Sequence, residues 1–133
     1  MVYLDTSALY KLIIDEQGSD ELAQYVQSLL DNGFTLVSSI LAETELKRIA
    51  QRDDIPVSTI EELLSFVNLI EISSSEFIRA GNLITEHSKA LRSLDALHIV
   101  SAELVQIDLA ITFDNRQASV FKDLGYKVYK TEN

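Results

Sequence analysis

Segments of strand length and segments of helical periodicity alternate along the whole chain of 133 residues. Short apolar runs predict strands, and stretches with apolar residues at three- and four-residue spacing predict helices. The predicted strands are residues 2–5, 34–38, 69–72, 109–113 and 126–129, and the predicted helices are residues 6–15, 19–32, 39–52, 58–66, 75–89, 94–106 and 115–124. Strands separated by helices favour an α/β fold in which helices cover both faces of a parallel sheet. The length fits a single domain over residues 1–133.

Local signals set the ends of several predicted helices. Ser19 and Ser58 are candidate N-caps, because a serine hydroxyl accepts hydrogen bonds from the free N–H groups of a first turn. Gly33 and Gly125 follow the predicted helices 19–32 and 115–124 as stop signals. Pro56 should end helical structure between the predicted helices 39–52 and 58–66, because proline lacks a backbone donor and restricts the preceding residue.

The composition excludes several classes of protein. The chain has no cysteine, which excludes a disulfide scaffold and a thiolate metal site and is compatible with the reducing cytosol. Asp5 lies where a secretory signal would have its apolar region. No uninterrupted apolar stretch reaches the roughly 18 residues of a membrane-spanning helix. We therefore expect a cytoplasmic protein without a membrane span.

The net charge of −10 counts against a simple nucleic-acid reader, because such proteins usually present a basic surface to the phosphates. An acidic enzyme that acts on RNA needs metal ions and a few well-placed cations at its cleft. The acidity can instead reflect a stable complex with a basic protein.

Acidic and hydroxyl side chains follow predicted strands at one edge of the expected sheet. Asp5 closes the first strand, Ser38 and Ser39 close the second, and Asp114 follows the fourth. Parallel α/β sheets bind their ligands in the crevice beyond the carboxyl ends of the strands. Each acid also has a simpler explanation, because aspartate is favoured as a helix cap and in Asx turns.

The helix predicted after the second strand carries two glutamates, and one of them should face the crevice. Residues two apart on a helix point in different directions. Glu45 shares a face with Leu41 and Ile49 at four-residue spacing, whereas Glu43 lies on another face. We interpret Glu45 as the site acid and Glu43 as a solvated residue.

Asp95 lies just inside the predicted 94–106 helix, with Ser93 as its candidate cap. It joins Asp5, Glu45 and Asp114 in a candidate constellation of four acids. Carboxylates that meet at one edge repel one another, which raises their pKa values unless they share a cation. Oxygen ligands without cysteine or a histidine cluster suit Mg²⁺ or Mn²⁺ rather than Zn²⁺. Such a site supports in-line displacement at a phosphodiester.

The segments around these acids form a recognisable series. They are Tyr-Leu-Asp-Thr-Ser-Ala-Leu at 3–9, Val-Ser-Ser at 37–39 with Glu45 six positions later, Leu-Arg-Ser-Leu-Asp-Ala-Leu-His-Ile at 91–99, Ile-Thr-Phe-Asp-Asn-Arg at 111–116 and Leu-Gly-Tyr-Lys-Val at 124–128. In this order they resemble the PIN-domain family, and within it the VapC-type toxins of bacterial and archaeal toxin–antitoxin pairs. The resemblance covers nearly the whole chain, and residues 91–98 are its most specific part.

The resemblance implies a five-stranded parallel sheet and a homodimeric, Mg²⁺- or Mn²⁺-dependent endoribonuclease that cuts RNA and is inhibited by a basic-tailed protein antitoxin. The four acids of the family fall on Asp5, Glu45, Asp95 and Asp114. The hydroxyl positions beside that site fall on Thr6 and Thr112. The acidic neighbour of Glu45, Glu43, leaves the assignment of that acid non-unique.

Two arginines flank site acids and are candidates for contact with phosphate. Arg92 precedes Asp95 and Arg116 follows Asp114, although an ion pair with those acids is an equal alternative. An acidic surface with an anionic pocket also favours a partner that inserts an arginine or a lysine. His98 follows Asp95 by three positions on the helix, and we interpret it as a hydrogen-bonded packing histidine rather than a metal ligand.

Three alternatives compete with the nuclease. A haloacid-dehalogenase-like phosphatase needs a second aspartate two positions after Asp5, where this chain has Ser7. A receiver-like phosphoacceptor needs an aspartate at the end of the third strand, where Ser73 follows Ile72. A catalytically inactive interaction module on the PIN fold is the third alternative, against which the presence of all four acids argues.

Overall fold

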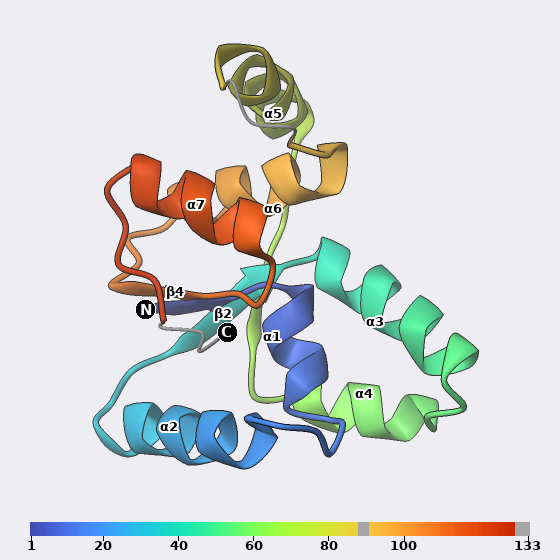
Figure 1. Cartoon of the computed structure of the whole chain (residues 1–133). Coiled ribbons are helices and arrows are strands. Elements are labelled where there is room, and N and C mark those ends of the chain that lie inside the picture. Colours follow the sequence, from blue (N-terminus) through green and yellow to red (C-terminus); the bar gives the residue numbers. More distant parts are fainter. Residues whose placement is uncertain (88–90, 130–133) are drawn as a thin grey trace.

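The computed structural model describes residues 1–87 and 91–129, and in them a parallel sheet lies between two layers of helices (Figure 1). The strands are β1 (Val2–Leu4), β2 (Leu36–Ser39), β3 (Asn68–Ile70) and β4 (Leu109–Ile111). Their order is β3-β2-β1-β4, and every pairing is parallel. The α/β class with a parallel sheet is therefore confirmed.

The expectation of five strands is wrong by one strand in the described part of the chain. The predicted strand 126–129 makes only an isolated parallel bridge, between Val128 and Ala110 of β4. The ring of Tyr129 lies 4.9 Å from that of Tyr25 and 6.2 Å from that of Phe113. This segment therefore ends in aromatic packing after one bridge and does not extend the sheet.

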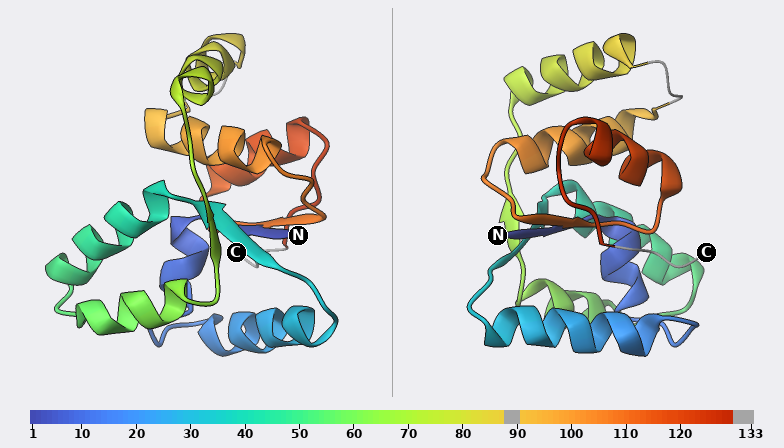
Figure 2. Two further views of the ribbon diagram at one scale, coloured as in Figure 1. Left: turned by 180° about the vertical axis from the view of Figure 1, so that it is seen from behind. Right: turned by 60° about the vertical axis from the view of Figure 1, so that its left-hand side comes forward.

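The helices are α1 (Thr6–Lys11), α2 (Ser19–Asp31), α3 (Leu41–Arg52), α4 (Val57–Leu64), α5 (Ser74–Glu86), α6 (Ser93–Glu103) and α7 (Asn115–Asp123). Figures 1 and 2 show α1 to α4 on one side of the sheet and α5 to α7 on the other, with α5 lying outside α6. Among the described residues no helix combines the length and the apolar character needed to cross a bilayer.

The alternation of side chains along the central strands builds a core on each face of the sheet. Val2 and Leu4 of β1 belong to the cluster beneath α1 to α4, whereas Tyr3 belongs to the cluster beneath α6 and α7. Ala110 and Ile111 of β4 divide in the same way between the two clusters. This period of two is what a strand buried on both faces requires.

Several helix boundaries differ from those predicted. Helix α1 ends at Lys11 rather than at residue 15, and the N–H groups of Ile13 and Ile14 both donate to the carbonyl of Tyr10 in a tight final turn. Two successive β-branched residues disfavour continuation of the helix at this point. Helix α4 has Pro56 as its N-cap instead of Ser58. Residues 88 and 89 of the predicted helix 75–89 lie outside the described residues.

Substitution of Leu46 should test how much the packing of α3 against the core contributes to stability. This side chain is fully buried in the cluster beneath α1 to α4. We expect Leu46→Ala to lower the free energy of unfolding by about 2–5 kcal/mol, because it removes buried methyl groups and leaves a cavity. Urea denaturation measures the change. Leu104→Ala is the matched control at an exposed position, and a similar loss in both variants would contradict the assignment.

Candidate active site

A pocket of about 280 Å³ brings together the four acids predicted from the sequence. Asp5 follows β1, Glu45 lies in α3, Asp95 lies in the first turn of α6, and Asp114 precedes α7. Chain segments distant in sequence therefore meet where the carboxyl ends of β1 and β4 lie together. The pocket residues are Asp5, Thr6, Ser7, Tyr10, Glu45, Ile49, Asp95, His98, Asp114 and Gln117.

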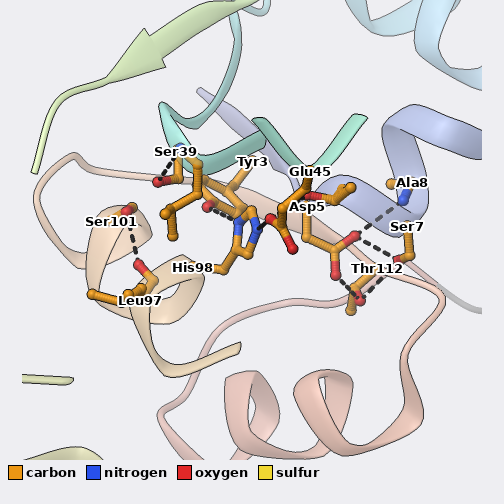
Figure 3. A network of polar contacts seen from close by, with 12 residues as sticks. Tyr3, Asp5, Ser7, Ala8, Ser39, Glu45, Leu97, His98, Ser101 and Thr112 are labelled. Carbon is orange, nitrogen blue, oxygen red and sulfur yellow. Dashed lines mark hydrogen bonds and ion pairs between the residues drawn. The ribbon is translucent and has the colours of Figure 1, made fainter. Parts of the chain in front are cut away.

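Asp5 is held by hydrogen bonds to both of its carboxylate oxygens (Figure 3). As the N-cap of α1, its Oδ1 accepts from the Ala8 N–H at 3.0 Å and from the Ser7 hydroxyl at 2.6 Å. Its Oδ2 accepts from the hydroxyl of Thr112. Burial raises the pKa of Asp5, whereas the nearby imidazole of His98 and these three donors act in the opposite direction. Asp5 is therefore both the N-cap of α1 and an acid of the pocket.

Glu45 receives two donors on a single oxygen. The Thr6 hydroxyl and the Nε2 atom of His98 each lie 2.7 Å from its Oε1. Burial acts to raise the pKa of Glu45, but the hydrogen bond and electrostatic attraction of the His98 imidazole and the hydroxyl of Thr6 outweigh it, so that the pKa is lowered. Glu43 instead forms a 3.0 Å ion pair with Lys47 on the surface of α3. The structure therefore places Glu45 in the pocket and Glu43 outside it.

Arg92 links the other two acids. Its Nε lies 3.2 Å from Asp95 Oδ2, and its Nη2 lies 3.3 Å from Asp114 Oδ2. Asp114 also caps α7, because its Oδ1 accepts from the Gln117 N–H at 3.0 Å. The ion-pair alternative for Arg92 is therefore what the structure contains, and the arginine is still 69% exposed at the edge of the pocket. Arg92, rather than Ser93, occupies the N-cap position of α6.

The other three residues predicted to contact the substrate, Thr6, Thr112 and Arg116, differ in their position relative to the pocket. Thr6 lines the pocket and donates to Glu45. Thr112 is fully buried behind Asp5, and its oxygen also accepts from the Asp114 N–H at 3.1 Å. Its position therefore suits support of the two aspartates better than contact with a substrate. Arg116 is exposed and is not among the residues that line the pocket.

Several residues that line the pocket were not predicted from the sequence. Ser7 donates to Asp5 and accepts from the Phe113 N–H at 2.9 Å, so it joins α1 to the end of β4. Tyr10 and Gln117 also line the pocket. Helical spacing could have indicated these two, because they lie four positions after Thr6 and three after Asp114 and so share a face with those residues.

Mutual repulsion between carboxylates is not what shifts the pKa values of Asp5 and Glu45. The pKa of Asp5 is raised by burial, and the pKa of Glu45 is lowered by its donors. Within residues 1–87 and 91–129, no three histidine, cysteine or acidic side chains are grouped closely enough to hold a metal ion as they stand. The donor set is nevertheless chemically suited to Mg²⁺ or Mn²⁺, because carboxylates share one pocket and no cysteine is present.

A parallel α/β sheet with an acidic pocket beyond its carboxyl ends defines the class to which this chain belongs, and comparisons with known proteins give the family. The model of the PIN domain matches residues 2–122. Ribonuclease VapC47 of Mycobacterium tuberculosis is 31% identical over 130 residues, which are 95% of this chain and 93% of that protein.

Solved structures have the same fold. The crystal structure of Mycobacterium tuberculosis VapC20, a toxin that cleaves the sarcin–ricin loop, superposes with a TM-score of 0.73 at 14% identity and covers 95% of this chain and 96% of that one. A toxin–antitoxin complex from Klebsiella pneumoniae gives 0.69 at 19% identity, with 98% and 97% covered. The chain belongs to the PIN-domain family. Membership contradicts the receiver-like and dehalogenase-like alternatives.

The raised pKa of Asp5 predicts how the stability of the metal-free protein varies with pH. Between 3.8, the ordinary value for aspartate, and the raised pKa of the folded state, the unfolded chain binds fewer protons at this carboxyl than the folded chain. Its contribution to stability therefore falls as the pH rises through this window and is constant above it. We expect the free energy of unfolding of the wild type, relative to Asp5→Asn, to fall over the same window in EDTA.

Urea denaturation of both proteins at a series of pH values measures this difference. Gln24→Ala, an exposed uncharged substitution in α2, is the control and should differ from the wild type by an amount independent of pH. A difference between the wild type and Asp5→Asn that rises with pH would show that Asp5 is stabilised as the anion.

Proposed function

We propose that this chain is an endoribonuclease and the toxin of a toxin–antitoxin pair, and that it hydrolyses RNA phosphodiester bonds with Mg²⁺ or Mn²⁺. The observation that carries the proposal is the convergence of Asp5, Glu45, Asp95 and Asp114 on one pocket. The relatives of the chain support RNA as the substrate, because proteins that match nearly the whole chain at 31% identity are ribonucleases.

The four acids would hold the divalent ion, which supplies Lewis-acid activation of water and stabilises negative charge on the phosphate. Asp5 is oriented for this role by Ser7 and Thr112, and Glu45 by Thr6 and His98. Asp95 and Asp114 share the guanidinium of Arg92. Binding of the ion by these two acids therefore requires the exposed Arg92 side chain to release at least one of them.

Arg92 released from the acids would lie at the rim of the pocket, where we assign it to the phosphates of the RNA. Guanidinium groups bind phosphate oxygens in bidentate geometry. The mobility that this exchange needs is consistent with the 69% exposure of the side chain. The exposed Arg116, in the first turn of α7, is assigned to more distant phosphates.

The proposed partner is a basic-tailed protein antitoxin, and we place the complex in the cytoplasm with the toxin as a homodimer. A net charge of −10 favours association with a basic chain. The structural relative from Klebsiella pneumoniae is itself a toxin–antitoxin complex. Phe77 and Ile78 of α5 are 55% and 65% exposed and supply apolar area for a contact between copies.

Asp5→Asn and Asp95→Asn should each abolish Mn²⁺-dependent cleavage of structured RNA while leaving the fold intact. Each variant removes a carboxylate from the proposed ion site but keeps the shape of the side chain. Cleavage is read on gels with Mn²⁺ and with EDTA, and the fold by circular dichroism. Glu61→Gln, an exposed acid of α4 outside the pocket, is the control and should cut as the wild type does. Full activity in both aspartate variants would refute the assigned roles, and an inactive wild type would favour the interaction module.

A reading frame beside this gene should encode a short protein with a DNA-binding head and a basic tail. Its product, mixed with the toxin, is expected to suppress cleavage by placing a cation in the acidic pocket. Replacement of the arginines and lysines of that tail by alanine should restore cleavage in the same assay. Suppression that survives this replacement would contradict a pocket-directed mechanism.

A further inference from the structure

A buried polar chain runs from the sheet to the pocket through Tyr3, His98 and Glu45 (Figure 3). The hydroxyl of Tyr3 lies 2.6 Å from Nδ1 of His98, and Nε2 of the same ring lies 2.7 Å from Glu45 Oε1. Tyr3 is fully buried and His98 is 2% exposed. Both ring nitrogens of a core histidine are therefore engaged, and one of their partners is an acid of the candidate site.

With a neutral His98 ring, the donors and acceptors of this hydrogen-bonded series have one consistent arrangement. An ionised carboxylate only accepts hydrogen bonds, so Nε2 of His98 must carry the proton. The Thr6 hydroxyl donates to the same Oε1 and lies 3.2 Å from Nε2, so its oxygen is placed to accept from that N–H. The Nδ1 atom then accepts from the hydroxyl of Tyr3, which fixes the tautomer of the ring.

We propose that Tyr3 and His98 form a positioning pair that fixes the orientation of the Glu45 carboxylate in the pocket. Oε1 is anchored by two donors, and within the described residues Oε2 has no hydrogen-bond donor and remains available to the pocket. The inference rests on the proposed function, because it assigns the pair a role toward the ion that Glu45 would help to hold.

The position of the pair in the fold supports this role. Tyr3 is in β1, Thr6 in α1 and His98 in α6, so that three elements fix one side chain carried by a fourth, α3. A histidine that serves only packing does not need a hydrogen bond to an acid of the site. Hydrogen-bonding partners that orient the ligands of a metal, in contrast, are a regular part of metal sites. The lowered pKa of Glu45 agrees with this arrangement, since its donors favour the charged form.

The test compares His98→Leu, which removes the donor, with His98→Gln, which can place an amide N–H near the position of Nε2. We expect His98→Leu to weaken Mn²⁺ binding, measured by calorimetry on the intact chain, about 10- to 100-fold. kcat for RNA cleavage should fall to a similar extent with little change in KM, because the defect lies in the acid and not in RNA binding. His98→Gln should recover most of both losses, and Tyr3→Phe should show a smaller loss of the same kind.

Two control variants separate positioning from general damage. His87→Leu and Tyr126→Phe make the same substitutions outside the pocket and should bind Mn²⁺ and cleave RNA as the wild type does. Wild-type Mn²⁺ affinity and kcat in His98→Leu would overturn the proposal. So would equal losses in His98→Gln and His98→Leu, because a structural role for the imidazole is not rescued by an amide.

A second measurement needs neither metal nor activity. In the wild type with EDTA, ¹⁵N NMR of the His98 ring should show the proton on Nε2 and none on Nδ1, and Tyr3→Phe should lose this fixed tautomer. A proton on Nδ1 in the wild type overturns the positioning pair even if the enzyme cuts RNA. The expected tautomer in a protein that fails to bind Mn²⁺ or cut RNA supports the pair and rejects the proposed function instead.

Discussion

The buried carboxylate of Asp5 joins the sheet, the first helix and the pocket. It caps α1 through the Ala8 N–H, takes the hydroxyl of Ser7 beside it, and takes the hydroxyl of Thr112 from the end of β4. A carboxylate that is 2% exposed is stable only where such donors replace water. The carboxylate oxygens of Asp5 that link the ends of β1 and β4 are also the oxygens that would face a divalent ion. The stability of this edge of the sheet and the chemistry of the pocket therefore both depend on the Asp5 carboxylate.

Much of this arrangement follows from patterns that are local in the sequence. The alternation of apolar runs with helical segments predicted a parallel α/β sheet, because each element must bury one face against another. The position of acids directly after strands then predicted the pocket, because parallel strands end at a common edge. The face of α3 favoured Glu45 over Glu43, since residues two apart cannot point the same way, and the structure decided between them by placing Glu45 in the pocket. These inferences need only the periodicity of each element and the order of the elements.

The features that the sequence did not predict all depend on distances between elements. Arg92 was equally compatible with phosphate contact and with an ion pair until α6 and α7 placed Asp95 and Asp114 within reach of one guanidinium. His98 was correctly interpreted as a hydrogen-bonded packing histidine, but its partners come from β1 and α3, which no spacing along α6 reveals. The burial of Thr112 behind Asp5 depends likewise on how β4 sits beside β1.

The excess of acidic residues acts on this protein differently at long and at short range. Over the surface, a net charge of −10 repels RNA and attracts basic chains. Inside the pocket the charge is offset only in part, because Glu45 accepts a hydrogen bond from His98 while Asp95 and Asp114 share the single guanidinium of Arg92. A pair of carboxylates that already binds a guanidinium of its own chain presents the geometry that an arginine from a basic partner would need. A partner arginine and Arg92 would then compete for the same oxygens, so that inhibition and substrate contact would be alternative uses of one electrostatic site.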